Sequence, residues 1–335
     1  NPMQPEATHV AVRDGRILAV GDLDRMRAWG AYTLDERFAD KVLMPGLVEG
    51  HCHLKEGSVW DMHYLGWFDR RDPNGKIWTG LRSMDAVVAR LAEIDAQMRS
   101  AGKDDSEALI AWGFDPIYFG DERMTVEHLH RVSQTRLIVV TNANGHMMNV
   151  NSAMLRLAEI TRENEVEGVV RFQGGTNDGE PTGELQEPAA MFLVVRKIGE
   201  SGILAPMTED GVRSFAALAC MQGVTTATDL VNRLTDADCK VLESALAADD
   251  CSIRILPAFQ AFHGTHGAAL GAEHVKSLLS RNTDRLRYGL VKMMLDGSIQ
   301  GFSARLRWPG YFNGAPNGIW VTAPAQYEAD FETYH

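Results

Sequence analysis

The chain has 335 residues, of which 45% are hydrophobic, and a formal net charge of −12 from 33 basic and 45 acidic side chains. This length provides a large hydrophobic core and allows about two domains. The acidic balance argues against a nucleic-acid or anionic-membrane partner, and no run approaches the roughly 18 apolar residues of a membrane span. Four scattered cysteines without metal-knuckle spacing favour a reducing, cytoplasmic compartment.

A β-hairpin is the first predicted element, over residues 9–20. Two segments rich in apolar residues, 9–13 and 16–20, flank the dipeptide Asp14-Gly15. This dipeptide is a strong signal for a type I′ turn.

The most informative motif is the pair His51 and His53, at the end of Met-Pro-Gly-Leu-Val-Glu-Gly-His-Cys-His. Side chains alternate across a strand, so both imidazoles point to one side and Cys52 to the other. Apolar residues before the pair predict a strand that carries it at its carboxyl end, where parallel α/β barrels build active sites. Two neutral imidazoles supply half of a tetrahedral metal shell. The alternative is two histidines in an ordinary loop.

Residues 55–200 lack a regular alternation of strands and helices. Apolar spacing predicts a helix over residues 84–100, with Ser83 as its N-cap. A strand is predicted at 137–140, and a glycine-rich, hairpin-like stretch at 174–183.

From residue 207 the pattern becomes regular, and each predicted helix is followed by a predicted strand. Such alternation about every 30 residues is typical of a parallel sheet. The three pairs are a helix from Thr208 to Gly223 with a strand at 224–228, a helix from Thr235 with a strand at 253–256, and a helix at 271–281 with a strand at 288–295.

Lys292 lies in the last of these strands, which we expect to be buried. A buried ammonium is costly unless it is paired or neutral, and burial lowers the pKa of lysine. A neutral amine reacts with carbon dioxide to give a carbamate, an anionic ligand that can bridge two cations. The alternative is a structural lysine paired with Asp296 or another carboxylate.

The motif around His51 and His53 resembles the first-strand signature of the amidohydrolase superfamily. Later segments resemble the blocks of its amidohydrolase 3, or YtcJ-like, branch in the same order. These segments are Gly-His-Met-Met-Asn-Val-Asn-Ser-Ala-Met-Leu (145–155), Pro-Thr-Gly-Glu-Leu-Gln-Glu (181–187), Gly-Val-Thr-Thr (223–226) and Val-Lys-Met-Met-Leu-Asp-Gly-Ser (291–298). Two departures are Glu49, where the superfamily usually has Asp, and residues 299–302, which replace the commoner Leu-Gly-Ser-Arg.

This resemblance implies an α/β fold, a (β/α)8 TIM-type barrel of which the chain holds the first half. Residues 1–44 would form part of a small β-sandwich and residues 45–54 the first barrel strand. Residues 55–205 would be a large insertion, and residues 206–335 would hold barrel strands two to four. Four strands without closure leave two sheet edges unpaired, which invites aggregation. We therefore expect the chain to be roughly the first 60% of a larger protein whose true termini lie beyond it.

The resemblance also implies a metal-dependent hydrolase of C–N bonds in small-molecule amides, with water activated by one or two zinc ions. His51, His53 and Lys292 would be metal ligands, with Lys292 carboxylated. The general base of the family is an Asp on the eighth strand, expected beyond residue 335. The alternative is a non-hydrolytic barrel relative, an isomerase or a small-molecule binding or regulatory protein. A homodimer is compatible with either reading.

Three further residues are candidates for substrate binding: His146, His263 and Asp296. His146 follows a predicted strand, where it either reaches a ligand or orients the insertion. His263 lies in a glycine-rich loop after the third barrel strand, which is either a substrate contact or a solvated loop. Beyond the fourth strand, aromatic residues either wall a pocket or pack a long loop: Trp308, Tyr311, Phe312 and Trp320.

Overall fold

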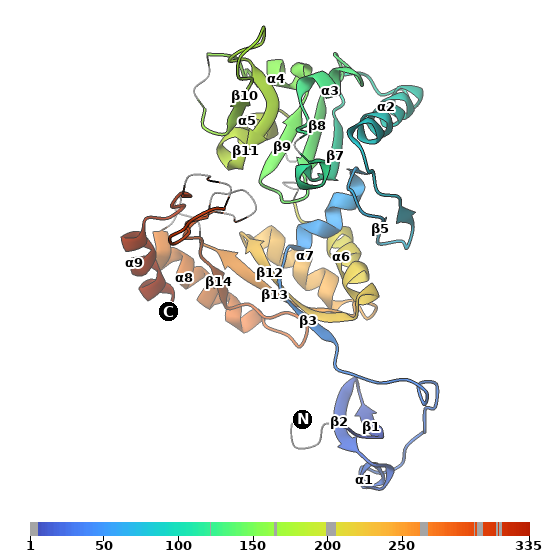
Figure 1. Ribbon diagram of the computed structural model, residues 1–335. Helices are drawn as coiled ribbons and strands as arrows, with labels where there is room; N and C mark the ends of the chain where they lie inside the picture. Colours follow the sequence, from blue (N-terminus) through green and yellow to red (C-terminus); the bar gives the residue numbers. More distant parts are fainter. Residues whose placement is uncertain are drawn as a thin grey trace. The chain divides into compact units, whose positions relative to one another are not determined.

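The computed structural model describes most of the chain, in two compact units, Asn1–Pro45 and Gly46–His335 (Figure 1). The described residues are 6–120, 122–163, 166–198, 206–261, 267–297, 299, 304–312, 314 and 317–335, apart from the side chains of Pro188 and Val231. None of the described helices combines the length and apolar character needed to cross a membrane.

The first unit contains the predicted hairpin. Strands β1 (His9–Arg13) and β2 (Arg16–Gly21) pair antiparallel. The turn residues Asp14 and Gly15 have φ of 50° and 72°, as a type I′ turn requires. A short helix, α1 (Leu23–Arg27), follows the hairpin and begins at its N-cap residue Asp22.

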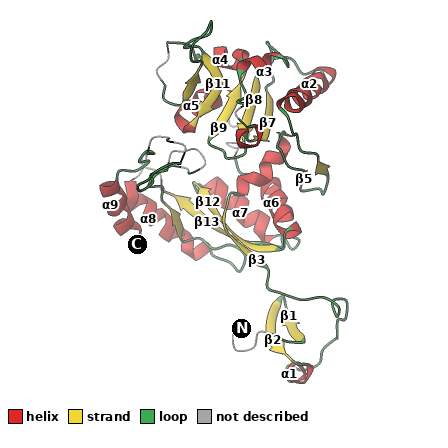
Figure 2. Cartoon of the chain, in the orientation of Figure 1, coloured by secondary structure: helices red, strands yellow, loops and turns green. Residues whose placement is uncertain are grey.

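The second unit holds a parallel sheet in the order β14-β13-β12-β3, with helices in the connections (Figure 2). This α/β arrangement is that of a TIM-type half-barrel. The strands are β3 (Leu47–Cys52), β12 (Val224–Asn232), β13 (Arg254–Gln260) and β14 (Leu290–Lys292); the helices are α6 (Glu209–Met221), α7 (Asp236–Ala247), α8 (Gly267–Leu278), the 3₁₀ turn η4 (Leu279–Arg281) and the later α9 (Pro324–Tyr334).

Two of the three predicted helix starts in this region are confirmed, whereas the third helix, α8, begins at Gly267, before the predicted residue 271. The Thr208 hydroxyl accepts from Gly211 N at 3.0 Å, and Thr235 forms a capping box with Asp238. The fourth strand is shorter than the predicted 288–295. Its partner β13 ends at Gln260, which pairs with Lys292, so the residues after Lys292 have no strand beside them.

The described part of residues 55–205, called the intervening region below, forms a six-stranded sheet. The strand predicted at 137–140 belongs to it, but the sheet as a whole was not predicted, because most of its strands are too short for a clear alternation. The six strands run in the order β10-β11-β9-β8-β7-β4. They are β4 (His63–Tyr64), β7 (Leu109–Phe114), β8 (Ile138–Asn142), β9 (Met147–Val150), β10 (Val169–Arg171) and β11 (Pro181–Gln186).

Helices cover this sheet, and one hydrophobic cluster packs on each side of it. Helix α2 (Met84–Ser100) has the predicted bounds, and its N-cap Ser83 accepts from Ala86 N at 3.2 Å. The remaining elements are the 3₁₀ helices η1 (Leu54–Asp61) and η2 (Pro116–Phe119), the strand pair β5 (Arg70–Arg71) and β6 (Ile77–Trp78), and the helices α3 (Val126–His130), α4 (Ser152–Leu157) and α5 (Glu187–Ile198).

The intervening region is joined to the half-barrel by a close contact between η1 and α6. A Cβ atom on Gly57 would lie 2.0 Å from the Gly211 carbonyl oxygen, so only glycine fits there. Because η1 directly follows His53, this contact fixes the chain at the carboxyl end of β3.

Arg136 is fully buried beside this sheet and holds the loop before β7. Its guanidinium forms an ion pair with Asp95 and donates to the backbone oxygens of Asp104, Glu107 and Lys103. A buried charge with this many acceptors ties α2 to the start of β7.

Candidate metal centre at the carboxyl end of the parallel sheet

His51 and His53 lie on the opposite side of β3 from Cys52, as the alternation predicts. Cys52 is 8% exposed and its thiol donates to the Thr228 carbonyl at 3.3 Å, within the hydrophobic core under the helices. Burial raises the pKa of this thiol to about 12. His51 is exposed and His53 is half-buried on the other face.

The two imidazole rings are neighbours, with centroids 5.6 Å apart and ring planes at 86°. Partial desolvation, followed by the positive charge of Lys292 and then of His53, lowers the pKa of His51. His51 is therefore neutral near pH 7, the form that binds a metal.

Lys292 lies on the strand at the other edge of the sheet from His51. β3 and β14 are at opposite edges of the four-stranded order, and the charge of Lys292 is one of the causes that lower the pKa of His51. Because the strands are parallel, His51 and Lys292 both lie at the carboxyl ends of their strands.

A buried carboxylate that the sequence did not single out lies behind His53. The imidazole Nδ1 lies 3.7 Å from Oδ1 of Asp229 on β12 and is buried without a hydrogen-bond partner. Because Nδ1 faces Asp229, Nε2 is the nitrogen left to bind a ligand. A carboxylate behind a histidine is the usual arrangement around protein-bound metals.

Glu49 has a local role on the same face of β3. Its Oε1 accepts from His51 N at 2.9 Å, which fixes the strand end just before the imidazole pair. The departure from Asp at this position therefore places a longer carboxylate along the backbone of His51.

The described residues bring two candidate metal ligands, His51 and His53, close together. Within the ranges given above, no group of three or more His, Cys, Asp and Glu side chains lies close enough to hold a metal ion. The two neighbouring imidazoles, one with its Nδ1 buried toward a carboxylate, nevertheless fit the donor chemistry of zinc.

The expectation that Lys292 lies in a buried strand is wrong. β14 is an edge strand, and Lys292 is only half-buried. No ion pair to Asp296 is found among the described side chains; Asp296 Oδ2 accepts from Arg305 N at 2.8 Å. Asp296 therefore ties down the following loop.

His146 is half-buried in the turn between β8 and β9. Its Nδ1 lies 3.0 Å from Oε2 of Glu187, the residue at the junction of β11 and α5. The hydrogen bond to Glu187 raises the pKa of His146, although burial acts the other way. His263 lies outside the described residues.

The aromatic residues beyond β14 do not act as one wall. Tyr311 is buried and its hydroxyl donates to the Ala304 carbonyl at 2.8 Å, while Trp320 lies under the Arg305 guanidinium at 4.5 Å. Trp308 and Phe312 are 94% and 96% exposed. The alternative that these aromatic residues pack the loop therefore holds for Tyr311 and Trp320, and not for Trp308 and Phe312.

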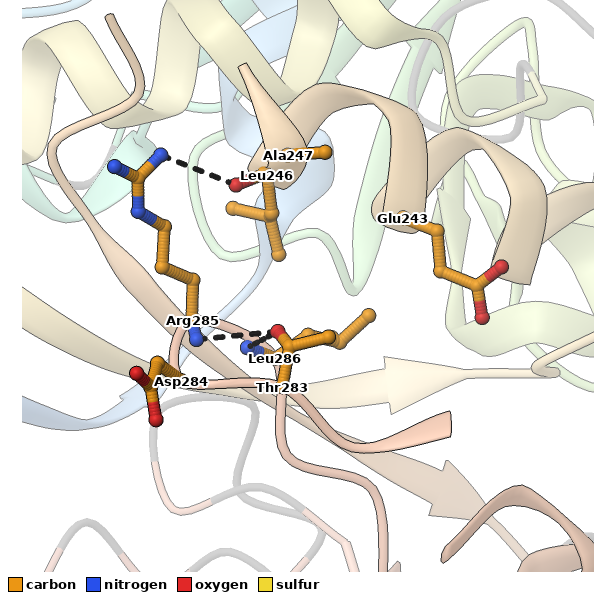
Figure 3. Close-up of a pocket in the computed structure, with 7 residues that line it drawn as sticks. All are labelled: Glu243, Leu246, Ala247, Thr283, Asp284, Arg285 and Leu286. Atoms are coloured by element: carbon orange, nitrogen blue, oxygen red, sulfur yellow. Dashed lines mark hydrogen bonds between the residues drawn. The ribbon is translucent and has the colours of Figure 1, made fainter. Parts of the chain in front are cut away.

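A pocket of about 230 Å³ lies elsewhere on the half-barrel (Figure 3). It is formed by the end of α7, at Glu243 and Leu246, and by residues 283–286. The Arg285 guanidinium closes the helix end by donating to the carbonyls of Leu246 and Ala248. These segments precede β13 and β14, so the pocket is at the amino ends of the strands, away from the histidines.

A family model and a curated protein each match most of this chain. A model described as "Amidohydrolase family" matches residues 39–319. Over 231 residues the chain is 26% identical to Protein LONG AFTER FAR-RED 3 of Arabidopsis thaliana, a match that covers 68% of this chain and 35% of that protein.

Two solved structures of uncharacterised metal-dependent hydrolases have a similar fold, and each comparison covers 97% of this chain. The one from Pyrococcus horikoshii OT3 has a TM-score of 0.58 at 17% identity, over 58% of that chain. The one from Pyrococcus furiosus has a TM-score of 0.53 at 18% identity, over 60% of that chain. The chain thus spans about a third of the curated relative and about three fifths of the two solved structures.

Proposed function

We propose that this chain, which belongs to the amidohydrolase family, forms part of a metal-dependent hydrolase that cleaves C–N bonds in small-molecule amides. The observation that carries the proposal is the pair of neighbouring imidazoles, His51 and His53, at the carboxyl end of β3, with ring centroids 5.6 Å apart. The printed descriptions of the two similar structures, both metal-dependent hydrolases, support the same reading.

In this proposal His51 and His53 hold one or two zinc ions through imidazole nitrogens. Glu49 fixes the backbone of His51, and Asp229 lies on the Nδ1 side of His53, which would leave Nε2 as the nitrogen that holds the metal. Bound zinc lowers the pKa of a coordinated water toward about 7 and polarises the scissile carbonyl.

Lys292 would complete this side of the site as a carbamate. After Nζ gives up its charge-bearing proton, it would form a bond to the carbon of carbon dioxide and release a second proton, which leaves an anionic oxygen donor. The half-buried position of Lys292 keeps Nζ accessible for this reaction. The general base remains the family's eighth-strand Asp, expected outside the 335 residues.

Residues 1–44 would contribute to a small β-sandwich and residues 55–205 would be an insertion after the first barrel strand. His146 would contact the substrate from that insertion. The intervening region begins one residue after His53 and is anchored by η1 against α6, which is consistent with this role.

Metal content and amide hydrolysis of the full-length natural protein test the proposal. Purified without chelator, the protein should contain about two zinc ions per chain by plasma mass spectrometry, and His51→Ala and His53→Ala should each lose metal and activity. Cys52→Ser, on the other face of β3, is the matched control and should keep both. A folded wild-type protein without bound metal would overturn the proposal and favour the binding or regulatory alternative.

A further inference from the structure

Two sequence motifs that the metal centre does not use meet in the intervening region. One is the block that begins Gly145-His146, and the other is the block that ends at Glu187. The side chains pair at 3.0 Å, and Glu187 N donates to the His146 carbonyl at 2.8 Å. A double connection of this kind fixes the imidazole relative to the carboxylate.

Glu187 adopts an unusual backbone conformation for this contact. Its φ is 62°, in the left-handed region that non-glycine residues rarely occupy. Such a conformation is strained for a residue with a side chain and is found most often at functional sites. The cost is not explained by core packing, since the Glu187 side chain remains about a third exposed.

Two hydrogen bonds and the conformation of the preceding residue fix the position of His146. Asn144 accepts from His146 N at 2.9 Å, Gly145 takes a φ of 69° in the turn, and Glu187 holds Nδ1. About a third of the imidazole is nevertheless exposed. With Nδ1 occupied, Nε2 is the nitrogen that remains for a ligand.

We propose that His146 donates a hydrogen bond or proton from Nε2 to an oxygen or leaving nitrogen of the amide substrate, and that Glu187 is its positioning residue. This inference rests on the proposed hydrolase function and extends it to the intervening region. The proton passes from His146 Nε2 to the leaving nitrogen as the C–N bond breaks, and the imidazole regains a proton from solvent.

The charges around His146 favour the donor form. Glu187 is the carboxylate that raises the pKa of His146. On the neighbouring strand β11, Glu184 is paired with Arg123, which lies shortly before α3. Asn144, on the turn itself, is neutral.

The test uses the full-length, zinc-loaded protein and an amide panel of formanilide, acetanilide, N-acetylglycine and hydantoin. For the panel member hydrolysed fastest, His146→Gln should lower kcat/KM by about 100-fold. Glu187→Gln should lower it by about tenfold at pH 8 and by much less at pH 6, where His146 is protonated without help. Zinc content should stay unchanged in both.

Glu122→Gln is the matched control, because Glu122 pairs with another histidine of the same region, His128, at 3.3 Å. It should change kcat/KM at neither pH. Should His146→Gln fail to fold, the pH profile of Glu187→Gln decides. If kcat/KM of Glu187→Gln equals that of the control, or falls by the same factor at pH 6 and pH 8, the inference alone is overturned. If the wild-type protein hydrolyses no member of the panel, the proposed hydrolase function is overturned as well.

Discussion

His53 Nδ1 lies 3.7 Å from the buried Oδ1 of Asp229, on the adjacent strand of the parallel sheet. This places a carboxylate behind one of the two imidazoles that we propose as metal ligands. In this proposal Nε2 of His53, and not Nδ1, would bind the cation.

Asp229→Asn should weaken zinc binding by roughly 10-fold to 100-fold, because the amide orients and polarises the imidazole less well than the carboxylate. Competition with a chromophoric chelator measures the affinity without any substrate. Asp249→Asn, a change of the same kind at an exposed position, should leave the affinity unaltered. Equal affinities of the Asp229 variant and the wild type would show that Asp229 does not orient the ligand.

Cysteine reactivity should follow burial. Cys52, Cys239 and Cys251 are buried, whereas Cys220 is exposed. Burial raises the pKa of the Cys52 thiol to about 12, so almost none of it is the reactive thiolate at pH 8. Iodoacetamide should therefore label Cys220 of the native protein first, as peptide mass spectrometry can verify. Early labelling of Cys52 would contradict the predicted orientation of β3.

Arg136→Ala should lower the free energy of unfolding by about 3 kcal/mol, since it removes a buried charge and leaves several backbone carbonyls without a donor. Asp95 keeps a second partner, Arg99, which limits the loss. Urea denaturation followed by circular dichroism measures the effect. Arg131→Ala, which breaks an exposed pair with Asp85, should cost no more than about 1 kcal/mol. Similar losses in both variants would argue against a structural role specific to Arg136.

The His146–Glu187 pair should make stability depend on pH. The pKa of His146 is raised in the folded protein, so its contribution is fully present below the ordinary value near 6.5 and is lost as the pH rises through the raised value. The difference in Tm between wild type and Glu187→Gln should therefore be larger at pH 6 than at pH 9. A difference that is constant over this range would mean that the pair does not titrate with folding.

Much of the half-barrel could be predicted from the sequence because its signals are local. Threonine caps mark the starts of α6 and α7, and Ser83 marks the start of α2. The alternation of His51, Cys52 and His53 likewise follows from strand geometry. Each of these features depends on residues within a few positions of one another.

Other features depend on distant parts of the chain and could not be predicted in this way. The partner of His53, Asp229, becomes its neighbour only when β12 pairs with β3. Glu187 meets His146 only through the mixed sheet of the intervening region, whose strands are too short to show a period. Lys292 was expected to be buried, but the edge position of β14 leaves it half-exposed.

The positions of β3 and β14 also bear on how the protein folds. These strands are the first and last of the parallel sheet along the chain and lie at its two edges, so the sheet is complete only when segments far apart in the sequence have docked. Contacts of such high sequence separation form late and slow folding. A chain in which β14 has not yet docked would hold its two histidines without Lys292, so its cation affinity should be lower than that of the completed sheet. Added zinc should therefore stabilise the completed sheet relative to the partly folded chain.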